Sequence, residues 1–432
     1  MLNRRNFLIK SSGIIALPTL PTLVGCYSVE KPKKIPKKNL VGSVVVIGGG
    51  FGGATAAKYL SLWSRGRIEI TLIEKNQFFY SCPMSNLVLG GHKDIDFITH
   101  NYQGLIQRGI KVIRDEVVSI DPVNLSIRTR TGRSFSADKL IVSPGIEFEY
   151  ENIEGLSLRA RKRVLHAWRA GPQTLALKSQ INTMPDGGVF VISVPRAPYR
   201  CPPGPYERAC QVAHYFKLNK PRSKVLILDA NPQIQSKKKL FISAWDNLYK
   251  NIIEYIPNVE INELDLGSKT LISLFGDRVK GDVLNVIPPN RAGEIAKSTG
   301  LITTNNKWCD VNWLTLESVK FKNIHILGDS TLATEKMPKS GHMANQHGKV
   351  VAYAIIKYFD GTSPNPSKMI NTCYSFVNNN SAVHVARVYD YDEKLKTMLP
   401  NLNAGGLSDT GSFIEGKHAF SWAKSIWADT LL

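Results

Sequence analysis

The sequence predicts an α/β protein with two Rossmann-like dinucleotide-binding domains and a smaller C-terminal α+β domain. Three observations support this prediction. A strand, a glycine-rich loop, a helix and a second strand follow one another near the start of the chain. A second alternation of strands and helices begins near residue 189, and residues 323–329 return to the pattern of the first domain. The 432 residues, of which 43% are hydrophobic and 21% charged, suffice for two or three domains with buried cores.

A glycine-rich loop follows the predicted strand of residues 41–47. Its sequence is Gly48-Gly-Gly-Phe-Gly-Gly53, and a predicted helix comes next. Gly48 permits a tight turn, Gly50 lets the backbone approach a pyrophosphate, and Gly53 lets the helix pack closely on the strand. Because the elements occur in this order, we expect Gly48, Gly50, Phe51 and Gly53 to bind a dinucleotide.

Four further features indicate that this dinucleotide is FAD. The second strand ends in Glu74, whose carboxylate suits a ribose diol. A late strand ends in Gly-Asp329, and in flavoproteins with two dinucleotide domains this aspartate binds the ribityl chain. The helix that starts at Gly341 directs its positive end toward the flavin pyrimidine. Gly145 ends the turn that closes the first half of the domain.

The loop of the second dinucleotide domain is unsuited to a nucleotide. It follows the strand of residues 188–193 and contains Arg200-Cys-Pro-Pro-Gly-Pro-Tyr-Glu207. A nucleotide loop needs small glycines that let backbone N–H groups approach a phosphate, and prolines and arginines do not provide them. The sequence therefore predicts that the NAD site is lost, that electrons come from another donor, and that Cys201 lies beside the flavin.

The predicted domain organisation combines these features. It comprises a twin-arginine lipoprotein signal at 1–25, a tether at 26–40, an FAD-binding domain split between 41–149 and 291–360, an NAD-like domain without the nucleotide loop at 150–290, and a C-terminal interface domain at 361–432.

The first residues predict export to the periplasm. Arg4 and Arg5 form a twin-arginine signature, and the apolar stretch 11–24 is too short to span a membrane. Leu23-Val-Gly-Cys26 has the pattern of a lipobox, which predicts a lipid on Cys26 and anchoring at the inner-membrane surface. Ordinary signal cleavage nearby, with Cys26 lost or free, is the alternative.

The net charge of +20 indicates an acidic partner or an anionic membrane surface, or else a basic surface without a specific role. No helix-turn-helix, zinc-finger or RNA-binding signature is present, so a nucleic-acid partner is not expected. Cysteine and histidine spacings predict no metal site, and we interpret His342 and His347 as structural.

Several motifs along the chain point to one family. The glycine-rich loop is generic, whereas two of the cysteine-containing motifs are specific. The specific ones are Cys-Pro-Pro-Gly-Pro-Tyr-Glu within Arg200-Cys-Pro-Pro-Gly-Pro-Tyr-Glu-Arg208, and Asn371-Thr-Cys-Tyr-Ser375. The other motifs are Phe79-Tyr-Ser-Cys-Pro-Met-Ser-Asn86, Ile287-Pro-Pro-Asn-Arg-Ala-Gly293 and Met337-Pro-Lys-Ser-Gly341. With the tryptophan-containing C-terminus, the chain resembles the flavoprotein subunit of flavocytochrome c sulfide dehydrogenase, in the FAD-dependent pyridine nucleotide-disulfide oxidoreductase superfamily, over nearly its whole exported length. The fold implied is similar to that of glutathione reductase.

The resemblance implies a role for each of five residues. Cys82 would carry FAD through a thioether, and Cys201 and Cys373 would form a redox disulfide over the flavin. Glu207 would lie near them as an acid or base, and Trp422 would cover the site. The implied reaction is sulfide:cytochrome c oxidoreduction, in which hydrosulfide attacks the disulfide and electrons pass through FAD to a c-type cytochrome subunit.

The residues alone leave other interpretations open. Cys82 is then a buried structural cysteine, and Cys201 and Cys373 are a structural disulfide or two buried thiols. Glu207 occupies the first turn of a helix, where the dipole favours a carboxylate, and Trp422, like Trp427, is a core or interface residue. Cys210 and the lipobox depart from the family pattern. Because Cys210 lies near Cys201 in the sequence, it stays open which cysteines form the disulfide. Cys309 has no assigned role.

Two other functions are compatible with the sequence. A sulfide:quinone oxidoreductase shares the fold but needs an apolar C-terminal surface that enters the membrane. The C-terminal tail of residues 415–432 is mixed, with Lys417, Lys424 and Asp429, and fits that role poorly. A non-catalytic flavin electron-transfer module is the second alternative.

Overall fold

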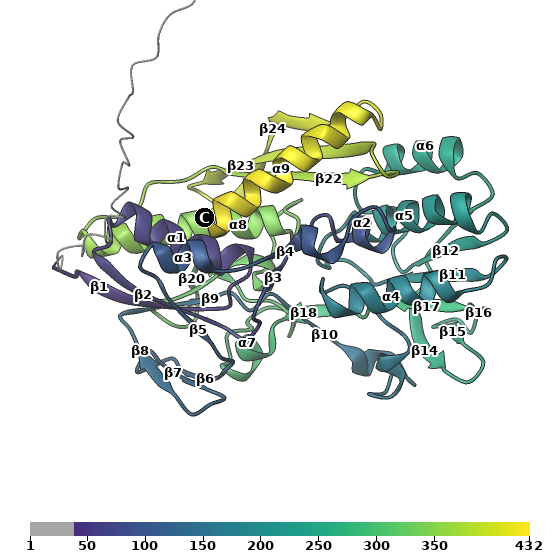
Figure 1. Ribbon diagram of the computed structural model, residues 1–432. Helices are drawn as coiled ribbons and strands as arrows, with labels where there is room; N and C mark the ends of the chain where they lie inside the picture. Colours follow the sequence, from purple (N-terminus) through teal and green to yellow (C-terminus); the bar gives the residue numbers. More distant parts are fainter. Residues whose placement is uncertain (1–38) are drawn as a thin grey trace, which may run out of the picture. The chain divides into compact units, whose positions relative to one another are not determined.

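The computed structural model describes residues 39–432 (Figure 1). The predicted signal, the lipobox with Cys26, and the tether up to residue 38 lie outside the described residues. The rest is a mixed α/β structure, as predicted, with several sheets and covering helices. None of the helices within residues 39–432 combines the length and apolar character needed to cross a membrane.

The first domain is built on a seven-stranded sheet of order β19-β20-β21-β9-β1-β2-β5. Its interior strand β1 (Gly42–Ile47) runs parallel to β2 (Ile68–Glu74) and β9 (Lys139–Val142). The late strand β21 (Ile324–Ile326) pairs in parallel with β9. The segment that ends in Asp329 therefore joins the same sheet as the glycine-rich loop.

Two helices pack on this sheet and on each other. They are α1 (Phe51–Trp63) and α8 (Gly341–Phe359). Helix α1 begins inside the glycine-rich loop, because Gly50 is its N-cap. Close packing at the loop requires glycine at Gly53, since a Cβ there would lie 1.9 Å from the Gly48 carbonyl oxygen.

The second domain has a four-stranded parallel sheet of order β13-β12-β11-β17. These strands are nearly continuous runs of apolar residues, which is typical of parallel strands covered on both faces. Their bounds and those of the helices of this domain are β11 (Val189–Val194), β12 (Lys224–Asp229), β13 (Ile253–Pro257), β17 (Val283–Val286), α4 (Pro172–Thr183), α5 (Gly204–Asn219) and α6 (Lys238–Leu248).

The C-terminal residues form an antiparallel sheet followed by a long helix. The sheet has the order β22-β23-β24, and the helix is α9. Figure 1 shows these elements alongside α8 and α5, and β22 contacts both of those helices. The C-terminal segment therefore reaches both dinucleotide-type domains. Its bounds are β22 (Met369–Phe376), β23 (Ala382–Asp392), β24 (Thr397–Leu407) and α9 (Phe413–Leu431).

Shorter elements complete the structure. They are β3 (Phe79–Tyr80), α2 (Ser85–Leu89), β4 (Thr99–His100), α3 (Gln103–Gln107), β5 (Lys111–Arg114), β6 (Val117–Asp121), β7 (Ser126–Thr129), β8 (Ser134–Ser136), β10 (Ile146–Phe148), β14 (Ile261–Asp265), β15 (Thr270–Ser273), β16 (Arg278–Lys280), β18 (Asn290–Ala292), α7 (Glu294–Ser298), β19 (Val311–Asn312) and β20 (Glu317–Ser318), with single 3₁₀ turns at Ile95–Ile98, Tyr150–Asn152, Ala160–Lys162 and Gly328–Ser330.

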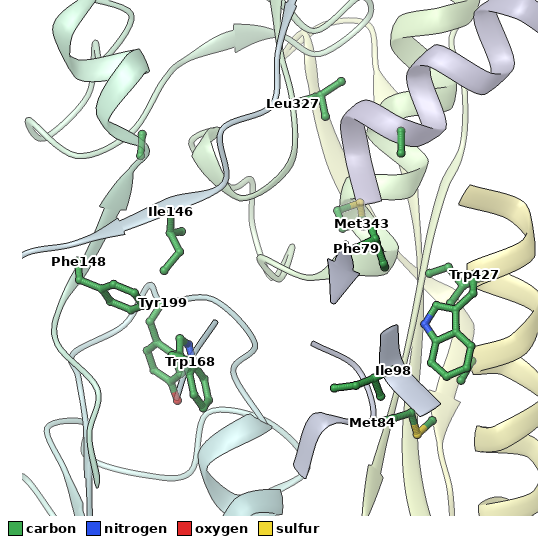
Figure 2. Close-up of a cluster of buried hydrophobic side chains, with 14 of the residues drawn as sticks. Phe79, Met84, Ile98, Ile146, Phe148, Trp168, Tyr199, Leu327, Met343 and Trp427 are labelled. Carbon is green, nitrogen blue, oxygen red and sulfur yellow. The ribbon is translucent and has the colours of Figure 1, made fainter. Parts of the chain in front are cut away.

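Segments that are far apart in the sequence share one hydrophobic core. Figure 2 shows Phe79 and Ile98 from the first domain, Trp168 and Tyr199 from the inserted one, and Trp427 from α9. All five side chains are buried. Burial of this apolar surface favours the assembly of the two domains and the C-terminal helix as one unit.

Candidate functional site

One cavity brings together five of the residues singled out in the sequence. It is lined by Cys82, Cys201, Glu207, Cys373 and Trp422. These residues come from the loop after β3, the loop before α5, the first turn of α5, strand β22 and helix α9. Because the first and last of them are 340 positions apart, only the tertiary fold makes them neighbours.

The glycine-rich loop has the geometry of a phosphate cradle. Gly48 has φ +95°, and a Cβ there would lie 2.3 Å from the Ser143 carbonyl oxygen, so this turn requires glycine. A Cβ on Gly50 would meet nothing within 4 Å, so the space at the helix N-terminus is open. An open helix N-terminus with exposed N–H groups suits a pyrophosphate.

Glu74 lies beside this loop at the end of β2. Its Oε2 accepts a hydrogen bond from the Gly49 N–H at 2.7 Å, and its Oε1 accepts one from the Asn76 N–H at 2.7 Å. Oε1 also accepts from Asn76 Nδ2 at 2.6 Å, so Oε2 is the oxygen that keeps a lone pair for a ribose hydroxyl. Glu74 therefore orders the loop and remains suited to the predicted contact.

Phe51 connects the glycine-rich loop with the cavity. Its ring lies 4.9 Å from the ring of Phe79, and a Cβ on Gly341 would lie 2.8 Å from it. Gly341 itself lines the cavity. The start of α8 therefore lies between the glycine-rich loop and the cysteines. The ring system of a flavin whose pyrophosphate is bound at the loop would need to reach this region.

Asp329 has an unpaired acceptor. Its Oδ1 is buried and has no hydrogen-bond partner among the described residues. Burial raises the pKa of the Asp329 carboxyl, an effect that the positive charges of Arg200 and Lys339 oppose. Because buried polar atoms in native proteins almost always have partners, this oxygen fits a hydroxyl donor, which the ribityl chain of FAD would supply.

Gly145 lies in the adjacent turn. It has φ +66°, a conformation that favours glycine, and its carbonyl oxygen accepts hydrogen bonds from the Ser330 hydroxyl and the Gly293 N–H. The turn is thereby fixed against the segment that carries Asp329. These residues, the glycine-rich loop and Glu74 all fit FAD.

The Cys201 loop is held in a specific backbone conformation. Cys201 has φ +59°, its N–H donates to the Lys339 carbonyl at 2.8 Å, and its carbonyl accepts from the Gly204 N–H at 2.9 Å. A Cβ on Gly204 would lie 2.6 Å from the Trp168 ring and 3.0 Å from the Cys201 sulfur. The proline-rich sequence therefore places the thiol at the entrance of α5 and packs it against Trp168.

Glu207 links three segments of the chain. Its Oε1 accepts a hydrogen bond from the Phe376 N–H on β22 at 2.9 Å, and its Oε2 accepts one from Asn86 Nδ2 on α2 at 3.0 Å. Burial raises the pKa of the Glu207 carboxyl, and these hydrogen bonds partly offset the effect. Both Glu207 oxygens accept hydrogen bonds, so the structure supports a role for Glu207 in positioning the Cys201 loop relative to the Cys373 strand.

Cys373 has a cation beside it that the sequence did not reveal. Lys237 Nζ lies 3.9 Å from the Cys373 sulfur, and it donates to the Cys373 carbonyl at 3.0 Å and to the Ser375 hydroxyl at 2.8 Å. Burial raises the pKa of the Cys373 thiol, whereas the Lys237 charge lowers it. Lys237 stands in a run of three lysines that looks like a solvated surface segment.

Two further buried cations support the site. Arg208 donates from Nε to Asn86 Oδ1 at 3.1 Å and from its terminal nitrogens to the carbonyls of His166 and Ala167. Lys339 donates to the carbonyls of Asp329 and Thr331. Burial lowers the pKa of Lys339 to about 7, although the charge of Asp329 opposes the shift. Arg208 and Lys339 both lie in motifs quoted above, but no separate role was predicted for them.

Cys210 does not share the cavity. It is fully buried on α5, and the Trp245 Nε1–H donates to its sulfur at 3.2 Å. Burial raises the pKa of its thiol to about 12. Cys309 is also buried, at the bridge to Thr331. Of the sulfurs described, those of Cys82, Cys201 and Cys373 share the cavity. All are free thiols in this structure, so the disulfide stays a prediction.

The two C-terminal tryptophans differ. Trp422 lines the cavity, and its ring lies 5.9 Å from His342 and 5.8 Å from Tyr374. Trp427 is buried and donates from Nε1 to the hydroxyl of Ser81, the residue before Cys82, at 2.8 Å. Helix α9 therefore contributes to the cavity and fixes the Cys82 loop.

The two histidines of α8 make structural contacts. Nδ1 of His342 accepts from the Thr372 N–H at 2.9 Å, and Nδ1 of His347 accepts from the Gly328 N–H at 3.1 Å. Within residues 39–432, no cluster of three or more His, Cys, Asp or Glu side chains is suited to a metal ion.

In the second dinucleotide-type domain, the position expected to bind a ribose is internally hydrogen-bonded. The acid at the end of its second strand, Asp229, is fully buried. Its Oδ2 accepts from the hydroxyls of Tyr206 at 2.7 Å and Tyr255 at 3.0 Å, and its Oδ1 accepts from the Asn231 N–H at 2.9 Å. In an NAD domain this position binds the ribose. Here its hydrogen bonds are internal, which supports the loss of the NAD site.

Comparison with known families agrees with these features. The model for the central part of the sulfide dehydrogenase [flavocytochrome c] flavoprotein chain matches residues 174–288, the flavin-binding model of flavocytochrome c sulphide dehydrogenase matches 365–431, and the pyridine nucleotide-disulphide oxidoreductase model matches 42–182. The sulfide dehydrogenase flavoprotein chain of Chlorobaculum thiosulfatiphilum is 53% identical over 45 residues, which cover 10% of this chain and 92% of that sequence.

More distant relatives have a related fold. The mitochondrial sulfide:quinone oxidoreductase of Dictyostelium discoideum is 26% identical over 322 residues, which cover 71% of this chain and 69% of that protein. The solved structure of the sulfide:quinone oxidoreductase from Aquifex aeolicus matches with a TM-score of 0.71 at 19% identity, covering 90% of this chain and 91% of that one. The predicted fold class and family resemblance are confirmed.

We expect Glu207→Ala to lower the free energy of unfolding by about 1–3 kcal/mol, because the Phe376 N–H and Asn86 amide lose a buried acceptor. Glu207→Gln retains one acceptor oxygen and should lose less. Guanidinium denaturation measures the difference. Glu254→Ala, at an exposed glutamate, is the control. Equal stability of the Glu207→Ala and Glu254→Ala proteins would contradict this role.

Proposed function

The chain belongs to the family of the flavoprotein chain of flavocytochrome c sulfide dehydrogenase, and on that premise we propose that it oxidises sulfide through Cys201 and Cys373 and transfers the electrons to a c-type cytochrome. The main support is the cavity in which these two cysteines meet Cys82 and Glu207. The loop at the expected position of a nucleotide site carries the Cys201 thiol. Strand β22, which is far away in the sequence, carries the Cys373 thiol.

The proposed chemistry begins with an oxidised Cys201–Cys373 pair. Hydrosulfide attacks one sulfur, so a new S–S bond forms, the old one breaks, and the electron pair leaves on the other cysteine as a thiolate. A second hydrosulfide attacks the outer sulfur of the persulfide and releases hydrogen disulfide. The two cysteines are then reduced, and two electrons must leave before the disulfide closes again.

The family binds FAD, and the residues around the cavity fit it. When bound, FAD accepts a pair of electrons and releases them one at a time. Gly50 and Glu74 would hold the pyrophosphate and ribose, and Asp329 would accept from the ribityl chain. We further propose that Cys82 bonds covalently to the flavin, supported by the position of its thiol in the cavity.

A second candidate function is sulfide:quinone oxidoreduction. It is favoured by the similarity to the Dictyostelium sulfide:quinone oxidoreductase over most of this chain. The cytochrome proposal is favoured by the two sulfide dehydrogenase family models and by the net charge of +20, which suits an acidic protein partner. We keep the cytochrome as the leading acceptor.

We also propose that the protein works in the periplasm and is held at a membrane surface by a lipid on Cys26. Support comes from the twin-arginine and lipobox patterns of the first 26 residues. A covalent flavin suits this location, since the export pathway carries folded proteins and a covalent link retains the cofactor.

Cys201→Ser and Cys373→Ser should each slow sulfide-dependent bleaching of the flavin by about 10³-fold or more, because each removes a participant in the exchange. Anaerobic stopped-flow absorbance measures the rate. Cys210→Ser, at a thiol outside the cavity, should retain it. Rapid bleaching in both cavity variants would refute the mechanism, and bound flavin in all three proteins controls for folding.

Cys82→Ser should release flavin on denaturation, whereas the unchanged protein should retain it. The physical reason is that only a covalent bond survives loss of the folded site. Acid precipitation followed by absorbance of the supernatant measures release, and peptide mass mapping locates the adduct. Flavin in the supernatant of the unchanged protein, or an adduct elsewhere, would exclude attachment at Cys82.

The reduced protein should transfer electrons to an acidic c-type cytochrome faster than to a short-chain quinone. The rate should fall as ionic strength rises, because salt screens attraction between a basic flavoprotein and an acidic partner. Steady-state assays with each acceptor at several salt concentrations measure this. Faster quinone reduction, without salt dependence, would favour the second candidate function.

A further inference from the structure

Lys237 is a buried cation that forms no direct ion pair among the described residues, although its charge acts at longer range on the Glu207 carboxyl. Its residue is 6% exposed, and its Nζ contacts a carbonyl and a hydroxyl of β22. No carboxylate among the described residues lies within ion-pairing distance of it. Burying an ammonium is costly unless an opposite charge or good hydrogen bonds compensate. A negative charge at this position would therefore be strongly stabilised.

The nearest group able to carry such a charge is the Cys373 thiol. Its sulfur lies 3.9 Å from Lys237 Nζ. The same nitrogen donates a hydrogen bond to the Cys373 carbonyl, which keeps the ammonium beside the sulfur. The lysine backbone is also fixed, since Lys237 has φ +58° and is the N-cap of α6. These contacts hold the Lys237 ammonium beside the Cys373 sulfur.

No lysine or arginine among the described residues donates to the Cys201 sulfur as Lys237 donates to that of Cys373, although Arg208 lies close enough to interact with the Cys201 charge. Burial raises the pKa of the Cys201 thiol well above the usual value, and the charges of Cys373 and Glu207 raise it further. Arg200 opposes them, but its guanidinium donates to the Trp168 carbonyl. Among the described residues, the charged or titratable groups around the pair are Glu207 and Arg208 on α5, Tyr199 and Arg200 in the preceding loop, Lys237 at α6, His342 on α8 and Tyr374 on β22, and Cys82 after β3 only while its thiol is free.

We propose that Lys237 is a positioning residue that holds Cys373 as the thiolate of the pair and thereby directs hydrosulfide to Cys201. The inference rests on the proposed function for the attack itself. Hydrosulfide bonds to the Cys201 sulfur, the Cys201–Cys373 bond breaks, and its electron pair remains on Cys373 beside the ammonium. The proton stays on the persulfide formed at Cys201, and Lys237 keeps its own.

The first test measures alkylation of each thiol in the reduced holoenzyme. Both cysteines are partly exposed, and iodoacetamide rates against pH are assigned by peptide mass mapping. Cys373 should react at a lower pH than Cys201. Lys237→Met should raise the Cys373 midpoint by about one pH unit or more, because it removes a nearby positive charge. The Cys201 midpoint should change less.

Matched variants separate charge from structure. Lys238→Met removes the exposed neighbouring lysine and should leave both profiles unchanged. Lys237→Arg retains the charge and should retain most of the Cys373 shift. If Lys237→Met fails to fold, the comparison of the two thiols in the unchanged protein still decides. A Cys201 midpoint at or below that of Cys373, or a Cys373 midpoint that ignores Lys237→Met, would overturn the proposal.

A second test locates the persulfide. One equivalent of sulfide is added anaerobically to the oxidised protein, which is then quenched in acid, trapped and mapped. Persulfide on Cys201 supports the proposal, and persulfide on Cys373 overturns it. If the protein takes up no sulfide, the proposed function fails, whereas the alkylation profiles still decide whether Lys237 stabilises the Cys373 thiolate.

Discussion

The buried carboxylate of Glu207 is the interaction on which the cysteine cavity depends. It comes from the first turn of α5, immediately after the Cys201 loop, and accepts hydrogen bonds from Phe376 on β22 and Asn86 on α2. A carboxylate in an apolar interior is costly unless its oxygens are satisfied. Here the partners come from two other segments, β22 and α2, so satisfying Glu207 also sets the position of Cys201 relative to the Cys373 strand.

The second dinucleotide-type domain acts as a scaffold for this contact. Its strands keep the order and parallel pairing of a nucleotide-binding sheet, but Asp229 is satisfied by Tyr206, Tyr255 and Asn231. Those tyrosines fill the interior with aromatic surface that stabilises the sheet edge. The loop at the position expected for phosphate binding instead carries Cys201 to the cavity.

The fold and part of the site are predictable because their signals are local. The glycine-rich loop and the strand ending in Asp329 each lie within a few residues, and the cysteine motifs are distinctive. Lys237 is different, since its neighbours in the sequence are exposed lysines and only the approach of β22 gives it a role. Cys210 likewise required the structure, because sequence distance along α5 does not tell which helix face meets Trp245.

The C-terminal helix belongs to the site as much as the glycine-rich loop does. The ammonium of Lys58 on α1 donates to the carbonyls of Ala428 and Asp429, which satisfies the last turn of α9 where the dipole favours a cation. The residue before Ala428 is Trp427, whose Nε1 donates to the hydroxyl of Ser81 beside Cys82. The same helix also places Trp422 at the cavity. Attaching the end of α9 to α1 therefore constrains both the Cys82 loop and Trp422, which line the cavity of the three thiols. Cys82 and α9 are far apart in the sequence, and hydrogen bonds rather than a covalent link thus hold the Cys82 loop against this helix.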